Sequence, residues 1–470
     1  MLRVLFVDRS NPIIVKWVSA LAEAVRELPI QIIFLSDKEK SAVVGNMEIV
    51  NVRDVPQRRS IQSLEEIYGF SVHRALVTER SFFDYSSFRR CQTYSDLTID
   101  QIGEIVLPYL NAFDYLVREK VDVISEGLAD NFMTSLAGRV ASHYGKPFYM
   151  GFGSYWWSDG MFFVDRLDQT SSEIDQRYRY YRDNPDKIDQ ARMTELYARK
   201  HVVQVANSYP WRMRLQQFKA RERSYEPPSW RHWLYRRVSA AASRFLIRKA
   251  IRSYGGPLDE DFLVFPLHVA PEATLLGSTP ELADQFSLIK NISMNMPFGV
   301  RLYVKEHPAQ RIGAGLDYGF YRRLTALPNV RYIRADASIS GFLEHKRCLG
   351  VAVINGTVGL EAAMMHRHAV FVFGRPLYGA AECFIKPASF EEFFNQLQKR
   401  RLGRFQFDDI ALYSMLHALD DTVVRAPVDL RVFKTWTDYA YASLPIHRQF
   451  LVNCLARFDP SSSRDVCVDR

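Results

Sequence analysis

The stretch LGVAVINGTVGLEAAMMH, residues 349–366, decides the fold of this chain. Its first six residues are apolar or glycine, as in a strand that is buried on both faces. They lead into the turn Asn355-Gly356-Thr357, and a helix is predicted over 358–366. A strand, a turn with glycine and a helix, in that order, predict a βα unit of a parallel sheet.

This turn has the chemistry of an anion site. The free N–H groups at the start of the helix, the helix dipole and the Thr357 hydroxyl all suit a phosphate. Glycine lets the backbone approach such a ligand closely, and Glu361, one turn further on, can accept hydrogen bonds from ribose hydroxyls. The alternative is an ordinary βα turn in which Thr357 caps the helix. The predicted nucleotide-binding residues are Asn355, Gly356, Thr357, Val358, Gly359 and Glu361.

A second motif, KEHP at residues 305–308, follows a predicted strand over 300–304. Lys305 and His307 supply cationic or hydrogen-bonding groups at the carboxyl end of that strand. Pro308 biases His307 away from helical geometry, so the imidazole is held for donation to a phosphate or a leaving group. The alternative is an exposed loop histidine. Together with the 355–357 turn, the motif predicts that Lys305, His307 and Pro308 bind nucleotide and that His307 is also catalytic.

Two carboxylates follow other predicted strands. Glu272 comes after the strand over 262–267, where it can serve as nucleophile, base or substrate anchor. Glu126 comes just past the predicted strand over 121–124 and precedes Gly127, which fits a general base for an acceptor hydroxyl. The alternative for each is a solvated or helix-capping glutamate. We predict that one of the two is the catalytic carboxylate.

Strands alternate with helices along most of the chain, which predicts α/β architecture with parallel sheets. The predicted domains are a Rossmann-like domain over 1–154, a helical basic insertion without strand signals over 155–255, a second Rossmann-like domain over 256–395, and C-terminal helices with a polar tail over 396–470. Open α/β sheets bind ligands beyond the carboxyl ends of their strands. We therefore expect the two Rossmann-like domains to face each other across a cleft that holds the substrates.

Composition narrows the partners without choosing one. The chain has 470 residues, is 47% hydrophobic and carries a formal net charge of +8, a balance that favours an anionic partner. Its five cysteines are scattered without CxxC spacing, which is typical of a reducing compartment and argues against a structural zinc site. No stretch of 18 apolar residues occurs, so no transmembrane helix is expected. A cytoplasmic location is predicted.

One basic stretch, Arg231 to Arg252, contains seven arginines and lysines and no acidic residue. Its apolar side chains give it a second face, so it can lie on an anionic membrane surface as an amphipathic helix. The alternatives are that the stretch binds nucleic acid or that it is a solvated helix face. Because no nucleic-acid-binding motif accompanies the stretch, no nucleic-acid partner is predicted.

The segments FPLHVAPE (265–272), LYVKEHP (302–308) and NGTVGLEA (355–362) together resemble the capsule-polysaccharide biosynthesis glycosyltransferases, a group that includes Kdo transferases using CMP-Kdo. The His-Pro pair with a following Ser/Thr loop is also similar to bacterial sialyltransferases of GT-B fold. The resemblance covers about residues 260–380 well and the N-terminal half loosely. It implies a GT-B-like protein with two Rossmann-like domains, the first for the acceptor and the second for the nucleotide sugar.

The resemblance also implies roles for individual residues. His307 would contact the donor phosphate and support departure of a CMP-type leaving group, Thr357 and its neighbours would hold that phosphate, and Glu361 would hold the ribose. Glu126-Gly127 partly matches the motif that carries the sialyltransferase base, with Ser125 at its first acidic position. Glu272 lies where related retaining Kdo transferases have an aspartate.

The predicted function is therefore metal-independent glycosyl transfer, with no cofactor, from a nucleotide sugar to a surface-polysaccharide or lipid-linked acceptor. A CMP-linked donor such as CMP-Kdo is favoured, and the enzyme would work in the cytoplasm at the inner membrane face. One alternative is a CDP-glycerol-type polyol-phosphate transferase. The other is a non-enzymatic assembly or export factor for polysaccharide.

Overall fold

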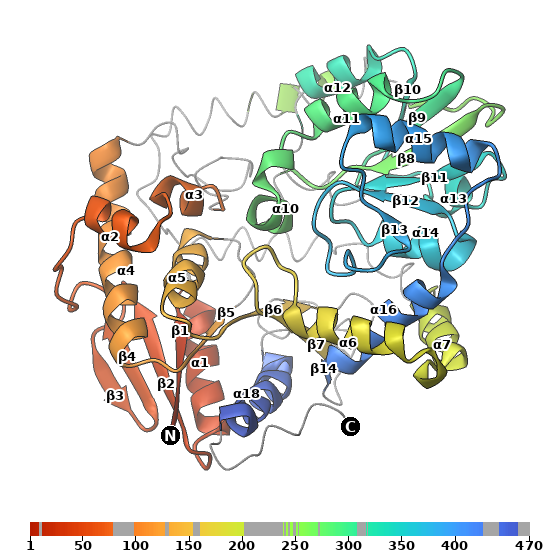
Figure 1. Ribbon diagram of the computed structural model, residues 1–470. Helices are drawn as coiled ribbons and strands as arrows, with labels where there is room; N and C mark the ends of the chain where they lie inside the picture. The colour runs from red at the N-terminus through yellow and green to blue at the C-terminus, as the bar shows by residue number, and fades with distance from the viewer. Residues whose placement is uncertain are drawn as a thin grey trace.

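The structure is a computed structural model (Figure 1). It describes residues 1–8, 12–78, 98–126, 131–153, 160–201, 238, 241–242, 245–247, 251, 253–270, 273–307, 316, 318–425 and 441–458. These residues form two sheets, one of eight strands and one of six.

The first sheet has the strand order β14-β7-β6-β5-β1-β2-β4-β3. Strands β6, β5, β1, β2 and β4 are parallel, whereas β3, β7 and β14 pair antiparallel at the two edges. The central strand β1 buries five of its six residues, because helices cover both of its faces. The strands are β1 (Leu2–Val7), β2 (Ile30–Ser36), β3 (Ala42–Val44), β4 (Met47–Asn51), β5 (Val123–Glu126), β6 (Phe148–Gly153), β7 (Gly160–Val164) and β14 (Val424–Arg425).

The helices of this sheet begin where the sequence supplies caps. Thr98 and Gln101 form a capping box at the start of the longest helix, and the Asn131 side chain accepts a hydrogen bond from the Thr134 N–H at 2.9 Å. The helices are α1 (Pro12–Ala24), α2 (Ile61–Tyr68), α3 (Val72–Leu76), α4 (Ile99–Glu119), α5 (Phe132–His143) and α18 (Leu444–Phe458).

The second sheet is wholly parallel, in the order β10-β9-β8-β11-β12-β13. Its strands are β8 (Asp261–Pro266), β9 (Val300–Lys305), β10 (Val330–Ile333), β11 (Cys348–Val353), β12 (Ala369–Val372) and β13 (Phe384–Ile385). Its helices are α10 (Ala273–Ser278), α11 (Gln285–Met294), α12 (Tyr318–Thr325), α13 (Ser340–Leu343), α14 (Val358–His366) and α15 (Phe390–Arg401), with a 3-10 turn, η4 (Pro280–Leu282).

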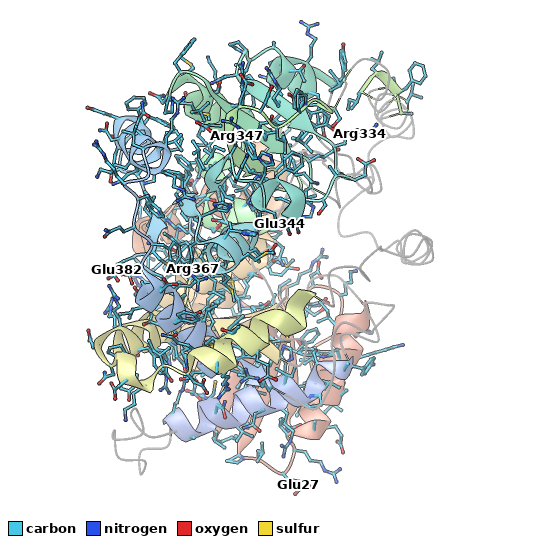
Figure 2. The ribbon with its side chains drawn as sticks, turned by 90° about the vertical axis from the view of Figure 1, so that its right-hand side faces the viewer. Glu27, Arg334, Glu344, Arg347, Arg367 and Glu382 are labelled. Carbon is cyan, nitrogen blue, oxygen red and sulfur yellow. The ribbon has the colours of Figure 1, made fainter. Side chains whose placement is uncertain are left out.

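Helices α6 (Ser172–Asp183), α7 (Gln190–His201) and α16 (Asp409–Thr422), with the short 3-10 turn η2 (Pro185–Lys187), connect the two units. Arg182 of α6 binds Glu382 at 2.9 Å and Asp408 at 2.6 Å. Figure 2 shows Arg367 and Glu382 at this junction, and Arg367 pairs there with Asp409 of α16. After α16 the chain returns to the first sheet as β14 and α18.

Each sheet has a point where the strand order reverses. In the first sheet it lies between β1 and β5, and in the second between β8 and β11. Helices α5 and α10 follow the carboxyl ends of β5 and β8, and both lie on the sides of the two sheets that face each other (Figure 1). Open α/β sheets bind ligands at such reversal points.

The predicted α/β class with two Rossmann-like sheets is confirmed. The prediction that 155–255 lacks strands is wrong at Gly160–Val164, which forms β7. Likewise, the predicted helical C-terminal region contributes the two-residue strand β14. Both strands are antiparallel additions to one edge of the first sheet, but β7 pairs with the neighbouring strand β6, and only the pairing of β14 with β7 joins residues that are distant in sequence.

Candidate functional site

The candidate site lies at the carboxyl edge of the second sheet, where β8 and β11 are neighbours. His268 follows β8, and the Asn355-Gly356-Thr357 turn follows β11. The main-chain N–H of Asn355 donates to Nε2 of His268 at 3.2 Å, so the two strand ends are joined directly. The structure therefore brings the predicted turn to the point where this fold class binds ligands.

The Asn355 side chain organises the turn. Its Nδ2 donates to the Ser278 hydroxyl at 2.5 Å and to the Thr279 hydroxyl at 3.2 Å. Its Oδ1 accepts from the Arg375 N–H at 2.6 Å. Because both ends of the amide are engaged by the protein, Asn355 fixes the position of the turn.

Gly356 and Gly359 have different surroundings. A Cβ at Gly356 would lie 3.9 Å from Nε2 of His268, an ordinary contact distance, and the Gly356 carbonyl accepts from the Tyr378 hydroxyl. A Cβ at Gly359 would lie 2.5 Å from the Tyr378 hydroxyl and 3.0 Å from a methyl of Val370. Gly359 thus allows α14 to pack closely on the sheet, as the third glycine does in dinucleotide-binding folds.

Thr357 stands at the start of α14 and is exposed. Its φ of −63° and ψ of −17° are helical, and its side chain makes no capping hydrogen bond. Its hydroxyl lies 3.4 Å from Oε1 of Glu361. The capping alternative for Thr357 is therefore not what the structure shows, and the first N–H groups of a helix have no partner within the helix.

Glu361 is buried one turn into α14, at 7% exposure. It lies beside Tyr378: burial, and after it the charge of Glu361, raises the pKa of the Tyr378 hydroxyl. The Tyr378 hydroxyl therefore stays protonated and able to donate to the Gly356 carbonyl. The predicted contact of Glu361 with ribose stays a prediction.

The KEHP motif is built differently from the turn. Lys305 is buried, and its Nζ donates to the carbonyls of Glu306 at 3.0 Å and Ala335 at 3.2 Å. Ala335 follows β10, on the side of β9 away from β11. The ammonium therefore stabilises the ends of β9 and β10 in this structure, and its contact with a phosphate stays a prediction.

The Glu306 carboxylate accepts hydrogen bonds from the hydroxyls of Tyr321 at 2.6 Å and Tyr332 at 2.9 Å. Burial, and after it Glu306, raises the pKa of both phenols. His307 follows immediately and is partly buried at the end of β9, the strand beside β8. The two hydrogen bonds from Tyr321 and Tyr332 thus hold Glu306, and with it the main chain that carries the His307 imidazole.

Glu126 lies on the other sheet. It is 4% exposed at the end of β5, and its Oε1 accepts from the main-chain N–H of Val7 in β1 at 2.7 Å. Asp8, at the end of β1, is also buried and accepts from the Ser36 hydroxyl at 2.7 Å. Two carboxylates therefore stand at the reversal point of the first sheet, and one oxygen of Glu126 binds main chain.

Some predicted residues lie outside the described part of the chain: Glu272, Pro308 and most of the stretch Arg231 to Arg252. Among the residues that are described, no group of three or more His, Cys, Asp or Glu side chains is arranged to hold a metal ion. The helices of the described ranges include none that is long and apolar enough to cross a bilayer.

His268 and Gln285 also belong to the site, although neither was among the predicted site residues. The main-chain N–H of His268 donates to Oε1 of Gln285 at 2.8 Å, and Nε2 of Gln285 donates back to the His268 carbonyl at 3.2 Å. Both residues are buried. The position of His268 directly after a strand was the available signal, but its contact with Asn355 depends on the strand order.

Fold and site define an open α/β protein with two Rossmann-like units and the Asn355-Gly356-Thr357 turn at the reversal point of the second. A model of the family described as "Capsule polysaccharide biosynthesis protein" matches residues 182–404, which include β8 to β13 and the turn. Over these residues the chain is similar to that family, as the three motifs predict. No curated protein matches the sequence.

Solved structures with a similar chain course include two KpsC transferases of Thermosulfurimonas dismutans. The β-Kdo 2,7 transferase is 10% identical, covers 76% of this chain and 97% of its own, and has a TM-score of 0.37. The β-Kdo 2,4 transferase is 12% identical, covers 63% of this chain and 79% of its own, and has a TM-score of 0.33. Anabaena Alr3699/HepE in complex with UDP-glucose is 10% identical, covers 96% and 100%, and scores 0.27. Scores this low assign no activity to the chain.

Proposed function

We propose that this protein transfers a sugar from a nucleotide donor, with CMP-linked sugars favoured, to a surface-polysaccharide or lipid-linked acceptor. The observation that supports the proposal most is the turn at residues 355–357, held between β8 and β11 by His268 and by the Asn355 amide. Its place at the start of α14 suits a nucleotide phosphate, because helix N-termini bind anions with free N–H groups and the helix dipole.

In the proposed reaction the acceptor hydroxyl attacks the anomeric carbon of the donor sugar. A carboxylate, Glu126 or Glu272, takes the hydroxyl proton if it acts as the base, the new C–O bond forms, and the bond from the sugar to the phosphate oxygen breaks. The nucleotide leaves with the bonding electrons. His307 and the N–H groups at the start of α14 stabilise the charge that develops on the leaving phosphate. Lys305 contributes positive charge at the carboxyl end of β9.

Acceptor binding is proposed for the first unit, and donor binding for the second. The basic stretch Arg231 to Arg252 would hold the enzyme at an anionic membrane surface on the cytoplasmic side, near a lipid-linked acceptor. Replacing its arginines by glutamine in pairs should reduce co-sedimentation with anionic vesicles and leave nucleotide binding unchanged.

The test is a thermal-unfolding screen with CMP, CDP, UDP and GDP, followed by product analysis with the sugar nucleotide of the best binder. The expected result is stabilisation by a cytidine nucleotide and a glycosylated product without added phosphate. Phosphate in the product would instead indicate polyol-phosphate transfer. If none of the four nucleotides raised the unfolding temperature, the proposal would be wrong.

A further inference from the structure

Arg139 on α5 is a cation for which the described residues provide no matching anion. Its Nε is buried and has no hydrogen-bond partner among the described residues, and its Cζ lies 5.0 Å from the centre of the Phe70 ring. Burial, and after it the positive charge of Arg74 on α3, lowers the pKa of its guanidinium. No carboxylate contributes to that shift, so the charge of Arg139 is uncompensated within the described structure.

Several other partly buried arginines of the described residues have hydrogen-bond acceptors. Arg182 binds two carboxylates, Arg367 binds Asp409, and Arg400 donates to the Leu349 carbonyl at 3.1 Å. Folding that buries a guanidinium nitrogen without an acceptor loses the hydrogen bonds that water made. An arginine in this state, next to a second arginine, is explained if its acceptor is a ligand.

The surroundings of Arg139 suit an organic anion. His143 lies one turn further along α5 and is exposed, so it shares a face with Arg139. Tyr68 packs edge-on against His143 with ring centres 5.0 Å apart and stacks on Phe70 at 6.0 Å. Aromatic rings beside guanidinium groups can contact the apolar face of a sugar while the arginines hold its charge.

The position of Arg139 relates it to the acceptor half of the molecule. Helix α5 begins after the carboxyl end of β5, where Glu126 stands. Arg139 is seven residues along that helix from Phe132, about 10 Å at 1.5 Å per residue. An anion bound at Arg139 would therefore lie on the unit that we propose for the acceptor.

We propose that Arg139 and Arg74 bind an anionic group of the acceptor, a sugar carboxylate or a phosphate, against Phe70. The site rests on the proposed function only for the identity of the ligand as an acceptor. The anion itself is inferred from the unpaired guanidinium, and it can be tested without turnover.

The experiment measures the thermal unfolding midpoint in sodium glucuronate and, separately, in sodium phosphate, at constant ionic strength. The variants are Arg139→Gln, Arg74→Gln and a control, Arg118→Gln, whose guanidinium binds Glu119 at 2.8 Å on α4. The unfolding midpoints of wild type and of the control should rise by about 2 °C or more with at least one of the two anions. Arg139→Gln should lose most of that rise, and Arg74→Gln part of it.

Without anion, Arg139→Gln should unfold at the wild-type temperature or above it, because an unpaired buried charge is removed. A rise with glucuronate alone identifies a sugar carboxylate, and a rise with phosphate alone identifies a phosphoryl group. Equal rises in wild type and Arg139→Gln, no rise with either anion, or a destabilised Arg139→Gln without anion would each overturn the proposal. Stabilisation by CMP, measured in parallel, reports separately on the nucleotide site.

Discussion

The two reversal points of this molecule have the same topology and opposite chemistry. Between β1 and β5 stand two buried carboxylates, Asp8 and Glu126. Between β8 and β11 stand His268, the Asn355 turn and the start of α14, which presents N–H groups. From this difference we propose that the donor phosphate binds at the second sheet, where the N–H groups at the start of a helix suit an anion, and that the acceptor hydroxyl binds at the first.

The largest effect is expected from His307→Ala. If His307 supports departure of the phosphate, turnover should fall by about 100-fold to 10,000-fold, with little change in the unfolding temperature because the side chain is only partly buried. The control is His345→Ala, a partly buried histidine that precedes β11 at the opposite edge of the sheet. Steady-state kinetics of the two variants measure the loss of turnover. An equal loss in both would mean that His307 has no specific part in the reaction. Unchanged biological function in His307→Ala would favour a non-enzymatic factor.

The carboxylates come next, because they test the assignment of the first sheet. Glu126→Gln and Glu272→Gln should differ, with only one of them losing about 100-fold or more in turnover while nucleotide affinity stays within twofold. Glu126→Gln should also loosen the pairing of β1 with β5, since an amide oxygen accepts more weakly from the Val7 N–H than a carboxylate does. Kinetics with both variants, each checked by calorimetric CMP binding, give the answer. Weakened CMP binding by Glu126→Gln would contradict the proposal that the nucleotide binds at the second sheet alone.

Gly359→Ala should destabilise the second unit by about 1–3 kcal/mol, because the added methyl meets the Tyr378 hydroxyl and Val370. The matched control is Gly341→Ala in α13, where nothing lies within 4 Å of the new Cβ. Urea unfolding of both variants measures the difference. An equal free energy of unfolding in the two would mean that close packing of α14 on the sheet does not hold the turn.

The smallest effect concerns pH and compares buried histidines of the two units. His447 of α18 packs edge-on against Trp17 at 4.7 Å, and the ring of His368 bonds the Leu343 carbonyl at 2.7 Å. Burial lowers the pKa of each to about 4. Since each folded pKa lies below the unfolded value, stability is complete above about pH 6.5 and falls as the pH drops toward 4.

At pH 5.5 each histidine should therefore reduce the free energy of unfolding by about 1 kcal/mol relative to pH 7.5. Urea titrations at the two pH values measure this loss. His447→Gln and His368→Gln should each lessen the pH dependence by a similar amount. If neither substitution changes it, the two imidazoles are not the groups that titrate.

The sequence predicts the central parallel strands of both sheets, because runs such as 349–354 and 262–267 consist of apolar residues, glycine and proline and end at turns. It also locates the 355–357 turn, since the glycine, the hydroxyl and the helix start are contiguous. Strand β14 escapes prediction, because it has two residues and pairs with β7 about 260 positions away. Strand β7 pairs with the neighbouring β6, so its apolar run Gly160–Val164 was an available local signal.

The strand order also limits what can be predicted about the site. Lys305 and the 355–357 turn both follow strands, but β8 lies between those strands and the Lys305 ammonium binds the Ala335 carbonyl. The same order brings His268 to Asn355, a contact that no local pattern contains. The local sequence thus indicates which residues follow a strand. It does not indicate which strand ends become neighbours at the edge of the sheet.

The most direct test of the central claim is hydrogen–deuterium exchange with and without CMP at a concentration that saturates the thermal shift. If the turn holds the nucleotide phosphate, exchange should slow in peptides that cover the turn and the first turn of α14, residues 354–362, and should not change at the carboxyl ends of β1 and β5. Protection confined to peptides around Asp8 and Glu126, with the 354–362 peptides unchanged, would contradict it.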